Sequence, residues 1–305
     1  MRCTFCCDQK NCHQTQQHSQ RHNHTSQIGG IQNIFCFFHD TDYNAFMKIN
    51  QAFAILQASG GIRAARIITE SGVKLSRFSV WRMSRQLRRG IPVAKIIHQK
   101  WFYGIKFYTN RHTLDPRPDT ETLVSAVISD CILNTSPCIL DLGTGTGCII
   151  CSLVKNIHGA TGIAIDKSRR ALKVAKRNIN NLGMNDKIKT KLTTFDTPHN
   201  YGTKFDIIVS NPPYIAHNDT RVNDGAQHDP DMALYAEDNG LAAYKSIAKH
   251  AKNWIKDDGK LYLEIGIDQG TDIKIIFMQN GWDLVKNEYD LGGVERVLVF
   301  QKAQL

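Results

Sequence analysis

The sequence predicts an α/β fold with a mostly parallel β-sheet, preceded by a small helical domain. From residue 138 onward, short apolar segments alternate with segments of helical periodicity. Four of the apolar segments have the length and composition of buried strands: 139–142, 162–166, 205–210 and 260–265. Upstream, between Tyr43 and Arg89, apolar residues recur every three or four positions, as they do in helices. Ligands of parallel sheets bind at the carboxyl ends of the strands, so functional residues are expected there.

The helical domain is predicted to end where its periodicity stops. A Gly60-Gly61 pair breaks the pattern, and Gly90-Ile91-Pro92 ends it. The aromatic segment 101–108 then has the character of a short hairpin, which we expect to pack the two domains together rather than to stack on bases. These boundaries divide the chain into four parts: a tail at 1–39, a helical domain at 40–100, a hairpin linker at 101–112 and the sheet domain at 113–305.

The composition of the 305 residues excludes several classes of protein. With 42% hydrophobic and 9% aromatic residues, the chain is predicted to fold around a large core rather than to be disordered. No apolar run approaches the roughly 20 residues of a membrane helix, and the first residues lack the apolar segment of a secretory signal. We therefore expect a soluble, cytoplasmic protein, with a mitochondrial location as the alternative for a eukaryotic source.

The positive charge of the chain is concentrated in one window. The net charge is +10, yet residues 62–111 alone carry 12 basic residues against one acid, Glu70. That window has a net charge of +11 and the rest of the chain −1. An acidic partner is expected to dock there, either a nucleic acid or an acidic protein face.

The tail, residues 1–39, is rich in Cys, His and Gln and has no apolar periodicity. Cys3, Cys6, Cys12 and His13 superficially resemble a zinc site, but the spacing between ligand pairs is not that of a zinc finger. We predict an irregular, disordered tail and no metal site. The later cysteines are expected to be small buried hydrophobes: Cys131, Cys138, Cys148 and Cys151.

A glycine-rich loop follows the first predicted strand of the sheet domain. It has the sequence Gly143-Thr144-Gly145-Thr146-Gly147, and glycine lets the backbone approach a ligand with no Cβ in the way. Cys148 stands where a dinucleotide-binding fingerprint has its third glycine. Asp166 ends the next strand, where an acid accepts hydrogen bonds from ribose hydroxyls. The combination favours an adenosine cofactor without a pyrophosphate, and S-adenosylmethionine fits better than NAD.

Asn211-Pro212-Pro213-Tyr214 lies at the carboxyl end of the fourth strand. An amide or aromatic amine nitrogen is a poor nucleophile because its lone pair is delocalised. The Asn211 side-chain carbonyl and the Pro212 main-chain carbonyl can each accept one N–H of such a group, which favours positive charge on the nitrogen. The prolines fix that carbonyl, and Tyr214 can stack on the planar substrate. We predict these four residues to be catalytic and substrate-binding, with Asn211 also touching the cofactor.

These motifs resemble those of the HemK/PrmC family of protein-(glutamine-N5) methyltransferases. The resemblance extends from about Tyr43 to Lys302. It includes the glycine loop and the Asn-Pro-Pro-Tyr motif, and four further segments: 114–121, 229–241, 264–266 and 292–297. It implies a Rossmann-like class I methyltransferase fold with seven strands, ending in an antiparallel pair at 282–288 and 296–301. It also implies S-adenosylmethionine as the methyl donor and the Gly-Gly-Gln glutamine of class 1 translation release factors as the acceptor.

The resemblance also assigns individual residues. Gly143–Gly147, Asp166 and Asn211 would hold the cofactor, and Asp196 matches the acid that the family places near the adenine. Thr197 stands where the family has an aromatic, and Phe195 could substitute for it. The helical domain would bind the release factor through its basic window. Glu121 could either line the mouth of the site or favour the start of the helix that follows.

Two other functions remain open from the sequence. Asn-Pro-Pro-Tyr is shared with adenine N6 and guanine N2 methyltransferases of nucleic acids, and the basic window suits such a substrate. A non-catalytic protein that binds release factors or ribosomes is the third possibility. On the first interpretation we expect a monomer with no membrane contact and no stable nucleic-acid partner.

Overall fold

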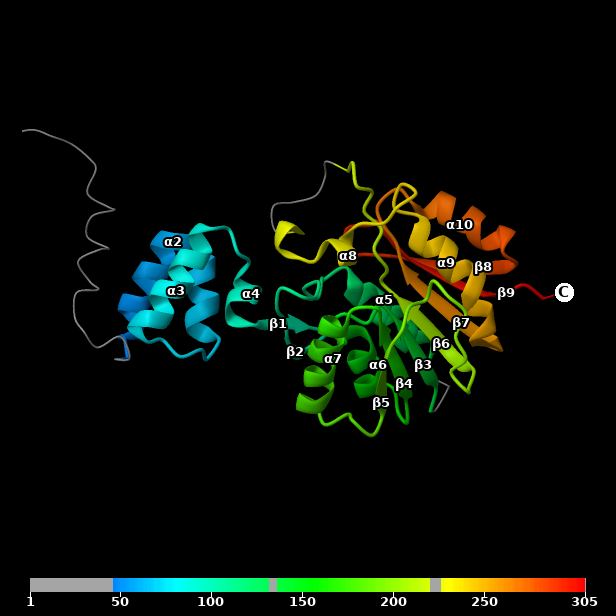
Figure 1. Ribbon diagram of the computed structural model, residues 1–305, viewed down its shortest axis with the longest axis horizontal. Coiled ribbons are helices and arrows are strands. Elements are labelled where there is room, and N and C mark those ends of the chain that lie inside the picture. Colours follow the sequence, from blue (N-terminus) through cyan, green and yellow to red (C-terminus); the bar gives the residue numbers. More distant parts are fainter. Residues whose placement is uncertain (1–45, 132–135, 220–225, 305) are drawn as a thin grey trace, which may run out of the picture. The chain divides into compact units, whose positions relative to one another are not determined.

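The computed structural model describes residues 46–131, 136–219 and 226–304 (Figure 1). The predicted tail at 1–39 lies outside these ranges. All described residues belong to one compact unit, Asn44–Leu305. Of the helices in these ranges, none is both long and apolar enough to cross a membrane.

Three helices form the upstream part of this unit: α2 (Ile49–Glu70), α3 (Arg77–Arg88) and α4 (Val93–Ile97). α2 is kinked at Gly61, whose φ of 83° and ψ of 168° are available essentially only to glycine. α3 begins with a capping box, in which Ser76 and Ser79 each accept the other's backbone N–H. The helices share a small core of Ala52, Leu56, Ala65, Ile68, Val80, Met83, Ile96 and Ile97.

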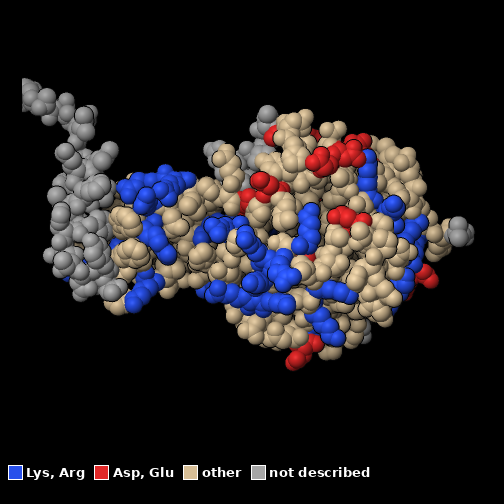
Figure 2. Space-filling model, in the orientation of Figure 1, with Lys and Arg blue, Asp and Glu red and all other residues tan. Residues whose placement is uncertain are grey.

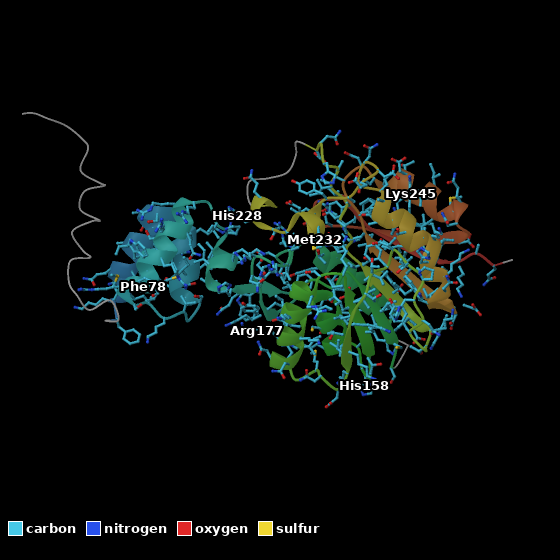
Figure 3. The ribbon with its side chains drawn as sticks, viewed as in Figure 1. Phe78, His158, Arg177, His228, Met232 and Lys245 are labelled. Carbon is cyan, nitrogen blue, oxygen red and sulfur yellow. The ribbon has the colours of Figure 1, made fainter. Side chains whose placement is uncertain are left out.

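A hairpin of β1 (Gln99–Phe102) and β2 (Ile105–Tyr108) follows. Phe102 and Phe107 are buried in the core of the sheet domain. The Tyr108 N–H donates to Asn178 Oδ1 at 2.8 Å. The guanidinium carbon of Arg177, a residue labelled in Figure 3, lies 3.6 Å from the centroid of the Tyr108 ring. The hairpin is thus fixed on α7 (Arg169–Asn181). Trp101 differs from its expected packing role, because 64% of it is exposed.

The large sheet has seven strands in the order β5-β4-β3-β6-β7-β9-β8. Neighbouring strands are parallel except at β9, which is antiparallel to β7 and to β8. The mostly parallel sheet and its terminal antiparallel pair are therefore confirmed. The strands are β3 (Cys138–Leu142), β4 (Thr161–Asp166), β5 (Ile188–Leu192), β6 (Phe205–Ser210), β7 (Ile255–Glu264), β8 (Trp282–Tyr289) and β9 (Glu295–Lys302). The direction of winding reverses between β3 and β6, which places the ligand crevice above their carboxyl ends.

Helices cover both faces of this sheet (Figure 1). One core joins alternate strand residues such as Ile139 to α5 (Thr120–Asp130), α6 (Cys148–Asn156) and α7. The other joins the intervening residues, such as Leu140, to α9 (Ala242–His250) and α10 (Gly270–Gln279). Short turns complete the described chain: η2 (Ala226–His228), α8 (Asp231–Leu234) and η3 (Ala251–Asn253). Cys131, Cys148 and Cys151 are buried free thiols, as expected, and Cys138 is half-buried.

Candidate active site

The glycine-rich loop leaves the end of β3 and turns into α6. Gly143, Gly145 and Gly147 have φ values of 72°, 56° and 79°, in the region that favours glycine. The Thr144 N–H donates to the carbonyl of Ile165 at 2.8 Å, and its hydroxyl donates to Asp141 Oδ2 at 2.6 Å. These two bonds fix the loop on β3 and β4, and its glycines leave a backbone surface that a ligand can approach.

Asp166, at the end of β4, is tied to this loop. Its Oδ2 accepts the N–H of Gly145 at 3.0 Å, and its Oδ1 accepts the N–H of Ser168 at 2.7 Å. Burial raises the pKa of Asp166, and these two hydrogen bonds act in the opposite direction. Asp141, which is fully buried beneath the loop, has its pKa raised to about 7 by burial.

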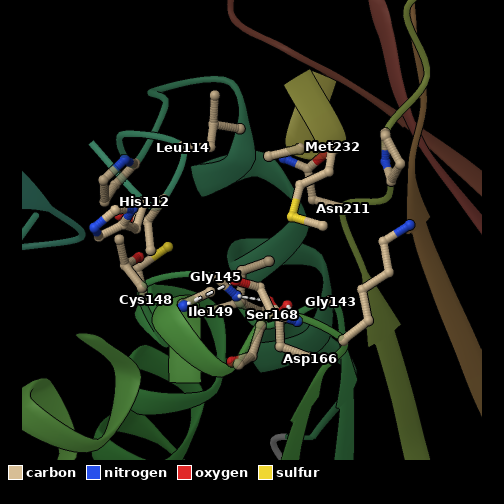
Figure 4. A pocket seen from close by; sticks show the side chains of 18 of the residues that line it. His112, Leu114, Gly143, Gly145, Cys148, Ile149, Asp166, Ser168, Asn211 and Met232 are labelled. Carbon is tan, nitrogen blue, oxygen red and sulfur yellow. Dashed lines mark hydrogen bonds between the residues drawn. The ribbon is translucent and has the colours of Figure 1, made fainter. Parts of the chain in front are cut away.

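A cavity opens beside the loop and encloses about 910 Å³ including its mouth. Asn211 and Met232 lie across it from the glycine loop and Asp166 (Figure 4). Apolar side chains form much of the remaining wall, among them Leu114, Ile149 and Phe195. A largely apolar wall with a few polar groups is typical of a small-molecule site.

The residues of this cavity fit an adenosine cofactor. Six of the predicted cofactor residues line it: Gly143, Thr144, Gly145, Thr146, Asp166 and Asn211. Gly147 does not; glycine is favoured there by its φ of 79°, since a Cβ would make only an ordinary 3.5 Å contact with Ala175. Asp196 and Thr197 are exposed and lie outside the lining, whereas Phe195 is part of it. The Asp196 carboxylate instead accepts the hydroxyl of Thr194 at 2.7 Å.

Asn211 is the first residue after β6 and lines two cavities. The second cavity adjoins the first, with which it shares Asn211 and Leu114, and includes Tyr214, Glu264 and Arg296. The Asn211 Nδ2 donates to Thr120 Oγ1 at 3.1 Å. Within the predicted motif, Pro213 lines the first cavity, Tyr214 lines the second, and Pro212 is buried and lines neither.

Two glycines allow neighbouring segments to pack closely against Tyr214. A Cβ at Gly240, where φ is 86°, would overlap the carbonyl oxygen of Tyr214. A Cβ at Gly266 would lie 3.0 Å from the Tyr214 ring. The same carbonyl accepts the Gln269 amide N–H at 3.0 Å. Segments far apart in the sequence therefore fix the last residue of the motif, and burial raises its pKa.

A buried ion-pair cluster anchors the loops around the site. Lys95 Nζ lies 2.9 Å from Asp115 Oδ1 and 2.8 Å from Asp229 Oδ1. Arg117 Nη2 donates to Asp229 Oδ2 at 2.7 Å. Only 5% of the Lys95 side chain is exposed, although the sequence places it in the basic window. Both Asp115 and Arg117 also line the first cavity.

Three residues at the site had no predicted role. His112 lines the first cavity, and burial, followed by the charges of Arg170, Arg111 and Lys95, lowers its pKa. Thr120 and Glu264 surround the Asn211 amide; both lie in motifs that match the family, which was the only signal for them. Glu121 lines neither cavity: its carboxylate accepts the N–H of Tyr103 at 2.8 Å, which ties the hairpin to α5.

Comparison with known proteins assigns this architecture. Residues 117–228 match the model of the methyltransferase small domain. The chain is 37% identical to the release factor glutamine methyltransferase of Agrobacterium fabrum, over 72% of its own length and 78% of that protein. The chain belongs to the release factor glutamine methyltransferase family. The fold and the family together imply S-adenosylmethionine as its cofactor.

Two further similarities define the limits of the family match. The chain is 39% identical to a bifunctional methyltransferase of Rickettsia prowazekii, but spans only 44% of that longer protein. The catalytic domain of hMettl16, solved with the MAT2A 3′UTR hairpin 6, superposes with a TM-score of 0.53. It is 18% identical over 65% of this chain and 76% of that one, which shows the class I methyltransferase fold alone.

Proposed function

We propose that this chain transfers a methyl group from S-adenosylmethionine to the side-chain amide nitrogen, N5, of the glutamine in the Gly-Gly-Gln motif of class 1 release factors. The observation that carries the proposal is the position of Asn211, which lines both cavities. A cofactor in the first cavity and a side-chain amide in the second would meet at this residue. Membership of the family supports the choice of glutamine.

The bound cofactor supplies an electrophilic methyl group on a sulfonium. Asn211 Oδ1 and the main-chain carbonyl of Pro212 accept the two N–H groups of the substrate amide, which orients its nitrogen and favours the positive charge that grows there. Tyr214 and Pro213 form the walls against which the planar amide rests, and Tyr214 faces the developing cation. The proton leaves to water after transfer. All four motif residues keep the predicted assignment to substrate binding and catalysis; for Pro212, which lines neither cavity, and Pro213, which lines only the first, that assignment rests on the motif.

The cofactor-binding roles divide between backbone and side chains. Gly143–Gly147 offers the backbone surface, and Asp166 accepts hydrogen bonds from the ribose. Phe195, which lines the first cavity, supports a contact with the adenine in place of the aromatic missing at Thr197. Asp196 and Thr197, which are exposed, keep their predicted cofactor-binding role only at the edge of the adenine site.

The helical domain, residues 40–100, is proposed to bind the release factor, with 101–112 as linker and 113–305 as the methyltransferase domain. Arg82, Arg85, Arg88 and Arg89 are exposed on or just after α3. An acidic face of the release factor would complement them. We further propose a cytoplasmic monomer without a membrane or a stable nucleic-acid partner.

The experiment is mass spectrometry of a matched release factor after incubation with the protein and S-adenosylmethionine. One added methyl on the Gly-Gly-Gln glutamine is expected. A release factor that stays unmodified, while the protein binds the cofactor, would remove the proposed substrate.

A second function has one specific observation in its favour. Basic residues also gather outside the 62–111 window (Figure 2). Helix α7 carries five exposed cations and no acid: Arg169, Arg170, Lys173, Lys176 and Arg177. Such a surface suits a phosphate backbone, and therefore an adenine or guanine methyltransferase of nucleic acids. Labelled methyl in RNA or DNA, in the same assay, would select it. A non-catalytic binding protein is disfavoured by the two cavities that meet at Asn211, and failure to bind the cofactor would support it.

A further inference from the structure

The environment of the Asn211 amide carries an inference that rests on the proposed function. Asn211 follows β6, and Glu264 ends β7, the next strand of the sheet. The register pairs Ser210 with Leu263, so Asn211 and Glu264 come next to each other one residue further along. Glu264 is 1% exposed and lines the second cavity together with Asn211.

Thr120 completes the group from a third element. It is the first residue of α5, it is 2% exposed, and its Oγ1 accepts the Asn211 Nδ2 at 3.1 Å. The side chains of Thr120 and Asn211 favour the ionised form of Glu264, which opposes the effect of burial on its pKa. Glu264 Oε2 has no hydrogen-bond partner within the described chain.

The chemistry of these three groups fixes one orientation of the amide. An ionised carboxylate only accepts hydrogen bonds, so both Thr120 and Asn211 must present donors to it. The Asn211 amide has its donors on Nδ2 alone, and so Nδ2 points toward Thr120 and Glu264. Oδ1, the acceptor that the proposed reaction needs, then faces away from this pair.

We propose that Glu264 and Thr120 are positioning residues that hold the Asn211 amide with Oδ1 available to the substrate amide. They do not touch the reacting atoms themselves. Without them the amide could rotate by half a turn and present N–H donors to a substrate that itself donates. A buried acid within an apolar strand end is costly, and this positioning role gives it a function.

The protonation of Glu264 distinguishes positioning from packing, because a purely structural role would not make kcat depend on the charge of this carboxyl. Burial raises its pKa to about 7; the charge of Asp119 acts in the same direction, and Arg296 acts against both. Tyr214, Tyr244 and Cys148 also lie within its electrostatic reach, with their own pKa values raised so that they stay neutral. Below about pH 7 the carboxyl gains an O–H donor and no longer enforces the amide orientation. The kcat of methyl transfer is therefore expected to rise with pH through that range.

The test compares Glu264→Gln, Thr120→Val and Thr120→Ser in the full chain. Glu264→Gln and Thr120→Val are expected to lower kcat by about 10- to 100-fold, because a small misplacement of a catalytic group has effects of that size. KM for the release factor and the calorimetric Kd for the cofactor should stay within about threefold. Thr120→Ser keeps the hydroxyl and should therefore retain the wild-type kcat. In Glu264→Gln, kcat should no longer depend on pH below about pH 7.

Asp130→Asn is the matched control. Asp130 lies at the far end of α5 and accepts the Tyr262 hydroxyl at 2.8 Å and Lys286 Nζ at 2.7 Å. This variant should lower the melting temperature and leave kcat unchanged. A wild-type protein that does not methylate the release factor contradicts the proposed function. Wild-type activity combined with full kcat in Glu264→Gln and Thr120→Val overturns the positioning role alone. If Glu264→Gln does not fold, the Thr120→Val and Thr120→Ser pair still decides.

Discussion

The crevice at the end of the sheet and the helical domain upstream hold their polar groups in different ways. In the crevice Asp166 and Asn211 are partly buried and hydrogen-bonded to fixed neighbours, among them Gly145 and Thr120. On α3, Arg85 and Arg88 are exposed, and neither forms an ion pair with a described acid. Groups that must be placed to a fraction of an ångström are fixed by burial, whereas groups that meet a partner through long-range charge are left in solvent.

The largest expected effect is at the centre of the crevice. Asn211→Ala removes the acceptor for the substrate amide, and the loss of one such group typically lowers kcat by about 10²–10³-fold. Cofactor affinity should stay within roughly tenfold, about 1.4 kcal/mol, because most of the first cavity is unchanged. Single-turnover methyl transfer and calorimetry measure the two quantities.

Ser210→Ala is the control for that variant. Ser210 is the preceding residue and is buried, but its hydroxyl donates to the carbonyl of Leu142 at 2.9 Å and lines neither cavity. It should lose stability and keep most of its activity. Full activity in Asn211→Ala would mean that the chemistry of the crevice does not depend on this amide.

Lys95 belongs to the helical domain, but it is buried and paired like the polar groups of the crevice. Removing it should have the next largest effect. Lys95→Met leaves Asp115 and Asp229 buried with one cation fewer, and breaking a buried ion pair in this way costs about 3–5 kcal/mol. Urea unfolding should show this loss. Adding Asp115→Asn should recover part of it, since the unpaired charge is then removed. A loss below about 1 kcal/mol would mean that Lys95 contributes no more stability than an exposed ion pair does.

The kink of α2 tests the backbone of the helical domain. A Cβ at Gly61 would meet no atom within 4 Å, so Gly61→Ala acts only through its φ of 83° and should cost about 1–3 kcal/mol of stability. Gly60→Ala differs, because its Cβ would lie 2.9 Å from Leu87 Cδ2. Leu87→Ala should therefore relieve Gly60→Ala and not Gly61→Ala, measured by thermal unfolding. Equal relief of both variants would show that crowding, not backbone conformation, sets the kink.

Much of the sheet could be predicted because its information is local. Apolar strands of four to six residues, such as 139–142 and 205–210, need only their own composition, and both occur in the structure. The glycine loop and Asn211 could be placed because each directly follows a strand, and carboxyl ends of parallel strands share one edge of the sheet.

What could not be predicted depends on contacts between distant segments. Lys95 was counted among the docking charges, yet its partners Asp115 and Asp229 lie 20 and 134 residues away. Glu264 gave no sign of its role, because its neighbours Thr120 and Asn211 come from other elements. The near-zero charge outside the basic window was an average, which concealed the cations of α7.

The smallest effect is expected on α3 and its end, where exposed charges are proposed to attract the release factor. Arg85→Gln, Arg88→Gln and Arg89→Gln together should raise KM for the release factor by about tenfold at low salt, and leave kcat and cofactor affinity unchanged. The effect should shrink as salt is added, because exposed charges are screened over about 10 Å at 0.1 M.

Removing three equally exposed cations from the methyltransferase domain, in Lys173→Gln, Lys176→Gln and Lys187→Gln, is the matched control. If both triple variants raise KM equally, the release factor senses total charge and the helical domain is no special docking face. If only the control set raises KM, the release factor docks on the surface formed by α7 and Lys187 instead of on the helical domain.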